Sequence, residues 1–137
     1  MRRLIIASHS ILAEGFKETL EFLTGMHNQI SSLCAYVEEI DDIDEQIKEL
    51  VDTTDEIIVL TDMAGGSVNQ KFFTYISDRV HVIAGMNLPL AMSIALQLGN
   101  DNLDIGAIIA EAQQQIIYMN NQKSEERIED EKNELLK

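Results

Sequence analysis

Glu56-Ile57-Ile58-Val59-Leu60-Thr61 is the clearest β-strand in the sequence, because it is a short apolar run rich in β-branched residues. A similar run, Leu4-Ile5-Ile6-Ala7, lies near the start of the chain. Short apolar runs of this kind are typical of buried strands. We therefore expect these two stretches to form the centre of a β-sheet.

Apolar runs alternate with amphipathic segments along most of the chain, and this alternation predicts the fold class. Further strands are expected at residues 30–37 and 80–84, and helices at 11–25, 42–51, 67–77, 90–98 and 103–115. Such alternation predicts an α/β fold with a doubly wound, mostly parallel sheet and helices on both faces. In the flavodoxin-like strand order 2-1-3-4, ligands bind where the carboxyl ends of the first and third strands meet.

The 137 residues include 10 Lys plus Arg and 24 Asp plus Glu, which gives a net charge of −14. This length fits a single domain, and the acidic charge disfavours nucleic-acid binding, which depends on Lys and Arg. No apolar run is long enough to span a membrane, and the polar residues after Ala7 argue against a signal peptide. With the single cysteine Cys34, these observations predict a cytoplasmic protein.

The C-terminal part of the sequence leaves one element open. Residues 116–119, Ile-Ile-Tyr-Met, fit either an extension of the preceding helix or a short last strand. From Gln122 onward the composition is polar and charged. We expect a domain over residues 1–120 and a charged tail over 121–137, helical or frayed.

The first loop of interest is Ser8-His9-Ser10, at the junction of the first strand and first helix. Backbone N–H groups at such a junction form a natural anion site, and a neutral imidazole there can act as a nucleophile. Ser8 or Ser10 can cap the helix and also contact an anion. The alternative is that the serines are only caps and His9 is an exposed loop residue.

The second loop, Thr61-Asp62-Met63-Ala64-Gly65-Gly66-Ser67, follows the strongest strand. Asp62 is expected to point into the same crevice as His9, where its carboxylate would orient the imidazole. Gly65 and Gly66 allow close approach of the backbone to an anion, and Ser67 adds a hydroxyl. The alternative is an ordinary tight turn in which Asp62 bonds nearby N–H groups.

Several kinds of chemistry are disfavoured by the motifs of the sequence. The signatures of nucleoside triphosphate and dinucleotide sites do not occur, and one His with one Asp is too few ligands for a metal centre. We therefore predict neither a metal nor a cofactor. A histidine, an orienting aspartate and a ring of N–H and hydroxyl donors suit a histidine that accepts and releases a phosphoryl group.

At these residues the chain resembles the IIA component of the mannose-family sugar phosphotransferase system (PTS). The resemblance covers residues 3–120 and rests on three stretches: 5–15, with Ser-His-Ser; 61–67, with Thr-Asp and Gly-Gly-Ser; and Val-Ile-Ala-Gly-Met-Asn-Leu-Pro at 82–89. The family fold is flavodoxin-like, and many members are dimers that exchange a C-terminal edge strand. The resemblance thus favours a strand at 116–119 and a homodimer. The family's usual Gly-Gly-Ser-Pro ends here in Val68.

The resemblance implies a reaction. His9 would take a phosphoryl group from the phosphocarrier HPr and pass it to a IIB component, with indirect association with the membrane components IIC and IID. Asp62 would hydrogen-bond the histidine, while Ser67, Gly66, Gly65 and Ser10 would bind the phosphoryl group. Two alternatives stay open: a regulatory phosphohistidine module, and the phosphoryl-donor subunit of a dihydroxyacetone kinase. A receiver domain is disfavoured, because the first strand is not followed by an acidic cluster.

The charge is unevenly distributed with respect to this expected site. Between Ile5 and Gly15 the only charged residue is Glu14, and between Leu60 and Gln70 it is Asp62. A phosphoryl group carries close to two negative charges, so acidic walls would repel it. The acidic surplus is expected on the outer helices and the tail, where it favours solubility.

Overall fold

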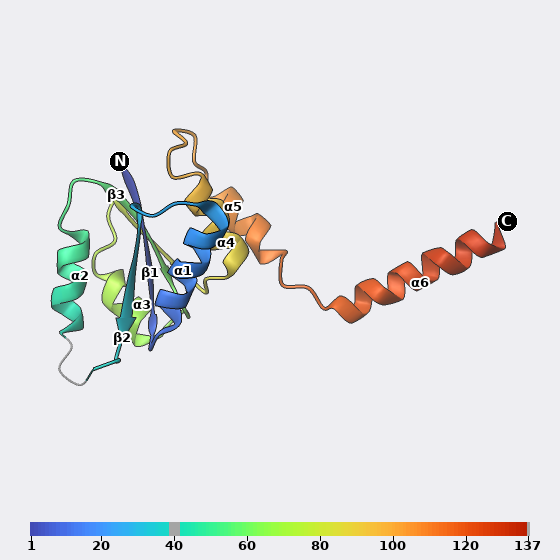
Figure 1. Cartoon of the computed structure of the whole chain (residues 1–137), viewed down its shortest axis with the longest axis horizontal. Coiled ribbons are helices and arrows are strands. Elements are labelled where there is room, and N and C mark those ends of the chain that lie inside the picture. Colours follow the sequence, from blue (N-terminus) through green and yellow to red (C-terminus); the bar gives the residue numbers. More distant parts are fainter. Residues whose placement is uncertain (39–41, 137) are drawn as a thin grey trace.

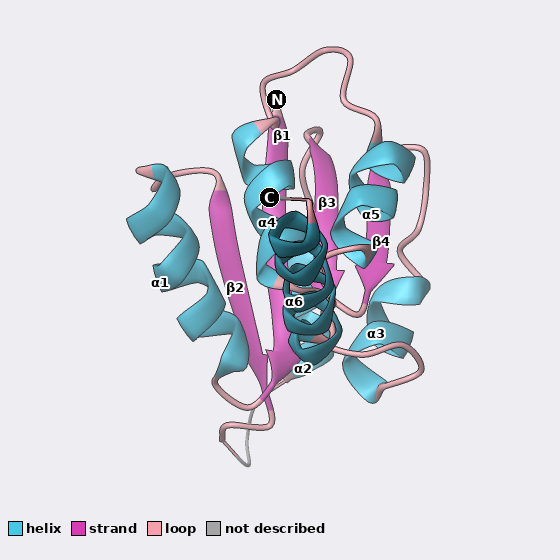
Figure 2. Cartoon of the chain, turned by 90° about the vertical axis from the view of Figure 1, so that its right-hand side faces the viewer, coloured by secondary structure: helices cyan, strands magenta, loops and turns pink. Residues whose placement is uncertain are grey.

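The computed structural model describes residues 1–38 and 42–136. In this part of the chain (Figure 1), one four-stranded parallel sheet has the order β2-β1-β3-β4 (Figure 2). The strands are β1 (Arg2–His9), β2 (Ile30–Ala35), β3 (Glu56–Thr61) and β4 (Val80–Ala84). The predicted α/β class and the strand order 2-1-3-4 are confirmed.

The register of the sheet brings the two loops of interest to the same edge. Ala7 of β1 pairs with Thr61 of β3, and His9 of β1 pairs with Ala35 of β2. Because all of these strands are parallel, the residues that follow them emerge at a common carboxyl edge. Asp62 therefore comes next to the end of β1.

Helices cover both faces of the sheet (Figures 1 and 2). On one face α1 (Leu12–Thr24), α4 (Leu88–Leu96) and α5 (Ile105–Gln113) pack on a cluster that includes Leu4 and Ile6. On the other, α2 (Ile43–Val51) and α3 (Ser67–Phe73) pack on a cluster that includes Ile5 and Ala7. Alternate residues of β1 thus face opposite layers, and burying each large aliphatic side chain contributes about 1.5–3 kcal/mol.

Several helix boundaries differ by one to four residues from those expected, and two of them have a clear local cause. The fourth helix begins at Leu88, inside the predicted loop, because the Asn87 side chain accepts a hydrogen bond from the Leu90 N–H and Pro89 suits a first helical turn. The third helix ends at Phe73 rather than at residue 77, and the chain then turns toward β4.

The C-terminal segment leaves the domain. Residues 116–118 are neither helix nor strand, so the strand expected at 116–119 is not formed within the single chain. These residues are exposed and lead to α6 (Met119–Leu135), which projects away from the sheet (Figures 1 and 2). The tail is therefore helical, and the segment before it packs on no core element that could impose a periodicity.

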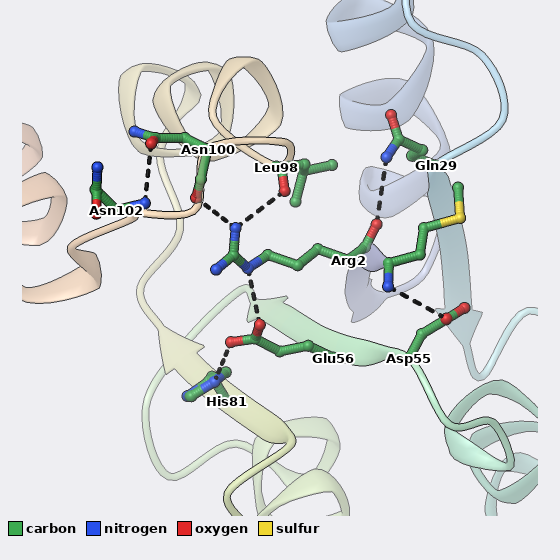
Figure 3. A network of polar contacts seen from close by, with 9 residues as sticks. Arg2, Gln29, Asp55, Glu56, His81, Leu98, Asn100 and Asn102 are labelled. Carbon is green, nitrogen blue, oxygen red and sulfur yellow. Dashed lines mark hydrogen bonds and ion pairs between the residues drawn. The ribbon is translucent and has the colours of Figure 1, made fainter.

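A polar network joins the amino edge of the sheet (Figure 3). Arg2 donates to the Glu56 carboxylate at 2.8 Å and to the carbonyl oxygens of Leu98 and Asn100 at 3.2 and 2.5 Å. The other Glu56 oxygen lies 2.9 Å from Nε2 of His81 on β4. Burial opposes ionisation of Glu56, but the bonds from Arg2 and His81 outweigh it and lower the pKa of this carboxyl.

No helix in the described ranges 1–38 and 42–136 is both long enough and apolar enough to cross a membrane.

Candidate active site

His9 is the last residue of β1 and is held from two sides by Asp62. One carboxylate oxygen, Oδ2, accepts the His9 backbone N–H at 2.8 Å and lies 2.7 Å from the ring nitrogen Nδ1. The other oxygen accepts the N–H of Met63 at 3.0 Å. The predicted His9–Asp62 pair is present, and the main chain and the ring of His9 are fixed by the same side chain.

The environment of Asp62 keeps the carboxyl group ionised. Its side chain is only 12% exposed. This burial favours the neutral acid, but the hydrogen bonds from the backbone and the ring of His9 outweigh it, so the pKa of Asp62 lies below its ordinary value. A carboxylate accepts hydrogen bonds and donates none, which assigns a proton to Nδ1 of His9.

The second ring nitrogen of His9 faces a hydroxyl group. Ser67 Oγ, at the start of α3, lies 3.3 Å from Nε2. In the neutral ring with a proton on Nδ1, Nε2 carries a lone pair and accepts from Ser67. The His9 side chain is 38% exposed, so an incoming group can reach it. The structure therefore joins His9, Asp62 and Ser67, the three residues on which the sequence argument relied most.

The glycine pair Gly65-Gly66 allows the second loop to lie against the His9 ring. Gly65 has φ +75, a left-handed conformation that favours glycine, and its carbonyl oxygen accepts from the Gln70 side chain at 3.0 Å. A Cβ on Gly66 would lie 3.2 Å from Cε1 of His9 and 3.2 Å from Cγ of Met63. Gly66 thus allows the second loop to approach the imidazole, as the sequence predicted for a backbone that must come close.

The two serines beside His9 serve the fold in different ways. Ser8 is fully buried and its hydroxyl accepts the Ala13 N–H at 2.7 Å, which is the helix-capping role expected for one of them. The N–H of Ser10 donates to Ala35 O at 2.8 Å. This N–H is therefore occupied by a contact to β2, which leaves only the exposed hydroxyl of Ser10 for the phosphate contact expected from the sequence.

Tyr36 is the site residue that the sequence argument missed. It directly follows β2, its hydroxyl donates to Ser67 Oγ at 2.8 Å, and its ring centroid lies 5.7 Å from that of His9. The apolar pattern predicts a strand over 30–37 that includes Tyr36, whereas β2 ends at Ala35, so Tyr36 follows the strand that borders the end of β1. The pattern of the sequence gave Tyr36 no motif of its own.

The charge around the site is low. Within the described part of the chain, the hydrogen-bond partners of His9, Asp62 and Ser67 include no lysine or arginine. In the same residues no cluster of three or more His, Cys, Asp or Glu side chains could hold a metal ion. The arrangement offers one nucleophilic nitrogen, one carboxylate that balances charge on the ring, and hydroxyl donors.

The sequence of residues 3–113 matches the family model EIIA-man, the fructose IIA component of the PTS. The chain belongs to this EIIA family. The match ends at the last residue of α5, so α6 lies beyond the matched residues. No curated protein sequence shows significant similarity to the chain.

Solved structures of PTS proteins share the EIIA fold. A candidate sugar PTS permease from Klebsiella pneumoniae is 37% identical, with a TM-score of 0.80 over 87% of this chain and 91% of that one. The PTS IIA protein associated with the fucose utilization operon of Streptococcus pneumoniae is 28% identical, with a TM-score of 0.77 over 88% and 95%. EIIA from Streptococcus agalactiae, at 22% identity and a TM-score of 0.74 over 88% and 99%, agrees in fold. This EIIA chain is therefore a component of a sugar PTS.

Proposed function

We propose that the protein is a phosphoryl carrier in which His9 accepts a phosphoryl group from HPr and passes it to a IIB component during sugar uptake. One observation carries the proposal: Asp62 holds Nδ1 of His9 at 2.7 Å while Nε2 faces the Ser67 hydroxyl at the exposed end of the site. A histidine with one nitrogen oriented by a carboxylate and the other free is arranged for nucleophilic attack.

The reaction at His9 requires no proton transfer. The lone pair of Nε2 attacks the phosphorus, and the bond between phosphorus and the donor breaks with its electron pair remaining on the donor. The ring then bears the phosphoryl group on Nε2 and a proton on Nδ1, so positive charge develops on the imidazole. The ionised Asp62 beside Nδ1 stabilises that charge. Transfer to IIB is the same step with His9 as the leaving group.

The surroundings of Nε2 suit a dianionic group. Ser67 supplies a hydroxyl donor 3.3 Å away, and the bare Gly66 backbone leaves space beside the ring. We assign phosphate contacts to Ser67, Gly66, Gly65 and Ser10, with Ser67 the principal donor and Ser10 acting through its hydroxyl alone. The one carboxylate of the site, Asp62, lies on the side of the ring opposite to the reacting nitrogen.

The rim of the site fits two successive partners. Ile11, Leu12 and Met63 are 69%, 49% and 55% exposed near His9, which gives a mostly apolar surface with an adaptable methionine. HPr and IIB would dock there in turn, and IIB would link the protein indirectly to IIC and IID. We place this exchange of partners in the cytoplasm. The proposed reaction uses no cofactor.

A homodimer is the second part of the proposal. Ile116 and Tyr118 are 83% and 69% exposed in a segment without helix or strand. In a dimer this segment would cross to the partner copy as an edge strand, which would bury these side chains. A mass near twice 15.4 kDa in solution supports this arrangement, and a monomer at micromolar concentration contradicts it.

Phosphorylation by a defined donor tests the carrier function. The protein is incubated with HPr, enzyme I and phosphoenolpyruvate, and the product is analysed by ³¹P NMR. We expect one acid-labile phosphoryl group on Nε2 of His9, and no label on a His9→Ala variant. His81→Ala is the matched control and retains the label. Persistence of the label in His9→Ala would overturn the assignment.

Discharge of the phosphorylated protein separates transport from signalling. Mixing with the cognate IIB component should remove the phosphoryl group from His9 within seconds and place it on IIB. A phosphorylated protein that IIB leaves intact would support the regulatory alternative instead. If the phosphoryl group stays on His9 with IIB but is transferred to a dihydroxyacetone kinase subunit, the protein is instead the phosphoryl donor of such a kinase.

A further inference from the structure

Tyr36 occupies a conformation that few bulky residues adopt. Its backbone has φ 64, in the left-handed region, although it is not a glycine. The preceding residue, Ala35, accepts the Ser10 N–H at 2.8 Å, so the end of β2 is tied to the loop that carries His9. This unfavourable backbone is held in place by the fold and brings the Tyr36 ring to 5.7 Å from the His9 ring.

The hydrogen bonds at this point run in one direction. In the neutral imidazole of His9, Asp62 assigns the one ring proton to Nδ1, so Nε2 can only accept. Ser67 has one hydroxyl proton and must direct it to Nε2, 3.3 Å away. Its oxygen is then an acceptor for the Tyr36 hydroxyl at 2.8 Å. The order of donation is Tyr36 to Ser67 to His9.

We propose that Tyr36 is a positioning residue for phosphoryl transfer: its hydroxyl occupies a lone pair of Ser67 Oγ and so aims the Ser67 proton at Nε2 and, after transfer, at the phosphoryl oxygens. The inference rests on the proposed carrier function. A serine hydroxyl rotates easily, and without Tyr36 it can donate elsewhere. A hydroxyl that itself accepts a hydrogen bond is also a stronger donor.

The relay moves no proton and forms no covalent bond. When Nε2 bonds to phosphorus, its lone pair is no longer available, and the Ser67 proton rotates to an oxygen of the phosphoryl group. Tyr36 keeps donating to Ser67 Oγ in both states. The effect is therefore on the orientation of one donor, and it is greatest where charge develops on the transferred group.

Hydroxyl deletion tests the relay. Tyr36→Phe retains the ring and loses only the donor, and Tyr75→Phe removes the hydroxyl of a half-buried tyrosine two residues after α3 as the matched control. Single-turnover transfer from phospho-HPr should slow about 3- to 10-fold in Tyr36→Phe at saturating donor, with an unchanged concentration dependence. The double variant Tyr36→Phe, Ser67→Ala should be no slower than Ser67→Ala alone.

A spectroscopic readout makes the relay testable without any transfer. In the unphosphorylated protein, the ¹⁵N resonance of His9 Nε2 should move in Tyr36→Phe and stay in place in Tyr75→Phe. An unmoved Nε2 resonance overturns the relay, and so does a wild-type rate in Tyr36→Phe or additivity in the double variant. A wild-type protein that takes no phosphoryl group from HPr overturns the carrier function instead, while the resonance still decides the relay.

Discussion

Two histidine–carboxylate pairs lie at opposite edges of the same sheet. At the carboxyl edge, Nδ1 of His9 is 2.7 Å from Asp62, and at the amino edge Nε2 of His81 is 2.9 Å from Glu56 (Figure 3). Judged by distance alone, the two pairs are nearly equivalent. The difference between them lies in the neighbours of each carboxylate.

The Glu56 carboxylate connects separate parts of the fold, whereas the Asp62 carboxylate mainly positions His9. Glu56 also accepts from Arg2, whose guanidinium donates to two carbonyl oxygens beyond α4. This carboxylate is shared between a guanidinium and an imidazole and links three parts of the chain. Asp62 bonds the backbone and ring of His9 and its neighbour Met63, and the remaining nitrogen of His9 faces a hydroxyl. What distinguishes the candidate site is therefore the other ring nitrogen of the histidine. In His9 this nitrogen is accessible and faces the uncharged hydroxyl of Ser67.

Neutralising each carboxylate should separate the two roles most strongly. In Asp62→Asn the amide can donate to Nδ1, which favours the tautomer with the proton on the reacting nitrogen. We expect phosphoryl transfer to slow about 100-fold. Glu56→Gln should leave the transfer rate within about twofold. Single-turnover rates with phospho-HPr measure the effect of each substitution. Equal decreases in rate in the two variants would contradict a special role of Asp62 in transfer.

Removing the guanidinium should affect stability rather than transfer. Arg2→Gln leaves Glu56 without its cation and two carbonyl oxygens without their donor, and we expect the free energy of unfolding to fall by about 2 kcal/mol. Arg127→Gln, in an exposed pair with Glu131 on α6, is the control and should change it by less than about 0.5 kcal/mol. Urea denaturation gives both values; similar losses in the two variants would contradict a structural role for the amino-edge network.

Acid should weaken both pairs in the same direction. The folded-state pKa of Asp62 and that of Glu56 are lowered, so each contributes stability that is present above its unfolded value of about 4 and is lost as pH falls through the folded value. The free energy of unfolding should therefore decrease from about pH 5 downward. Glu56→Gln and Asp62→Asn should each flatten this decrease, which denaturation between about pH 7 and 3 measures. A slope that neither variant changes would assign the acid sensitivity to other carboxylates.

A methyl group on the second loop tests the close approach at the carboxyl edge. In Gly66→Ala the added Cβ presses on the His9 ring and on Met63, and we expect a decrease of about 3- to 10-fold in the transfer rate. Gly106→Ala in α5 is the control: it should leave transfer unchanged and raise the free energy of unfolding by about 0.5–1 kcal/mol. A wild-type rate in Gly66→Ala would mean that the loop yields without disturbing the histidine.

The sequence predicted the parts of this arrangement that follow from strand ends. His9 and Asp62 each lie two residues beyond one of the two most apolar runs, 4–7 and 57–60, so a parallel sheet in the expected order must bring them together. Ser67 follows from the same loop. The contact of Tyr36 with Ser67 depends on a left-handed backbone at one residue, which a hydrophobic pattern does not encode.

The errors and open points have a common cause. Residues 116–118 contact no core that would impose a helical or strand period, so their pattern was ambiguous, and the single chain forms neither element there. The roles of Ser8 and Ser10 were not separable, because one is buried and the other exposed only once α1 packs on the sheet. The hydrophobic pattern of the sequence predicted structure for segments that pack on the core, and it was ambiguous for segments that do not.

The hydrogen bond to the buried Ser8 hydroxyl helps to order the site when the chain folds, before any partner binds. Ser8 holds the first turn of α1, Asp62 holds the His9 N–H, and Ala35 holds the next N–H, that of Ser10. Three successive residues are thus immobilised when the chain folds, and the entropy of ordering them is lost at that stage. The imidazole is preorganised, and no loop has to close before a partner meets it.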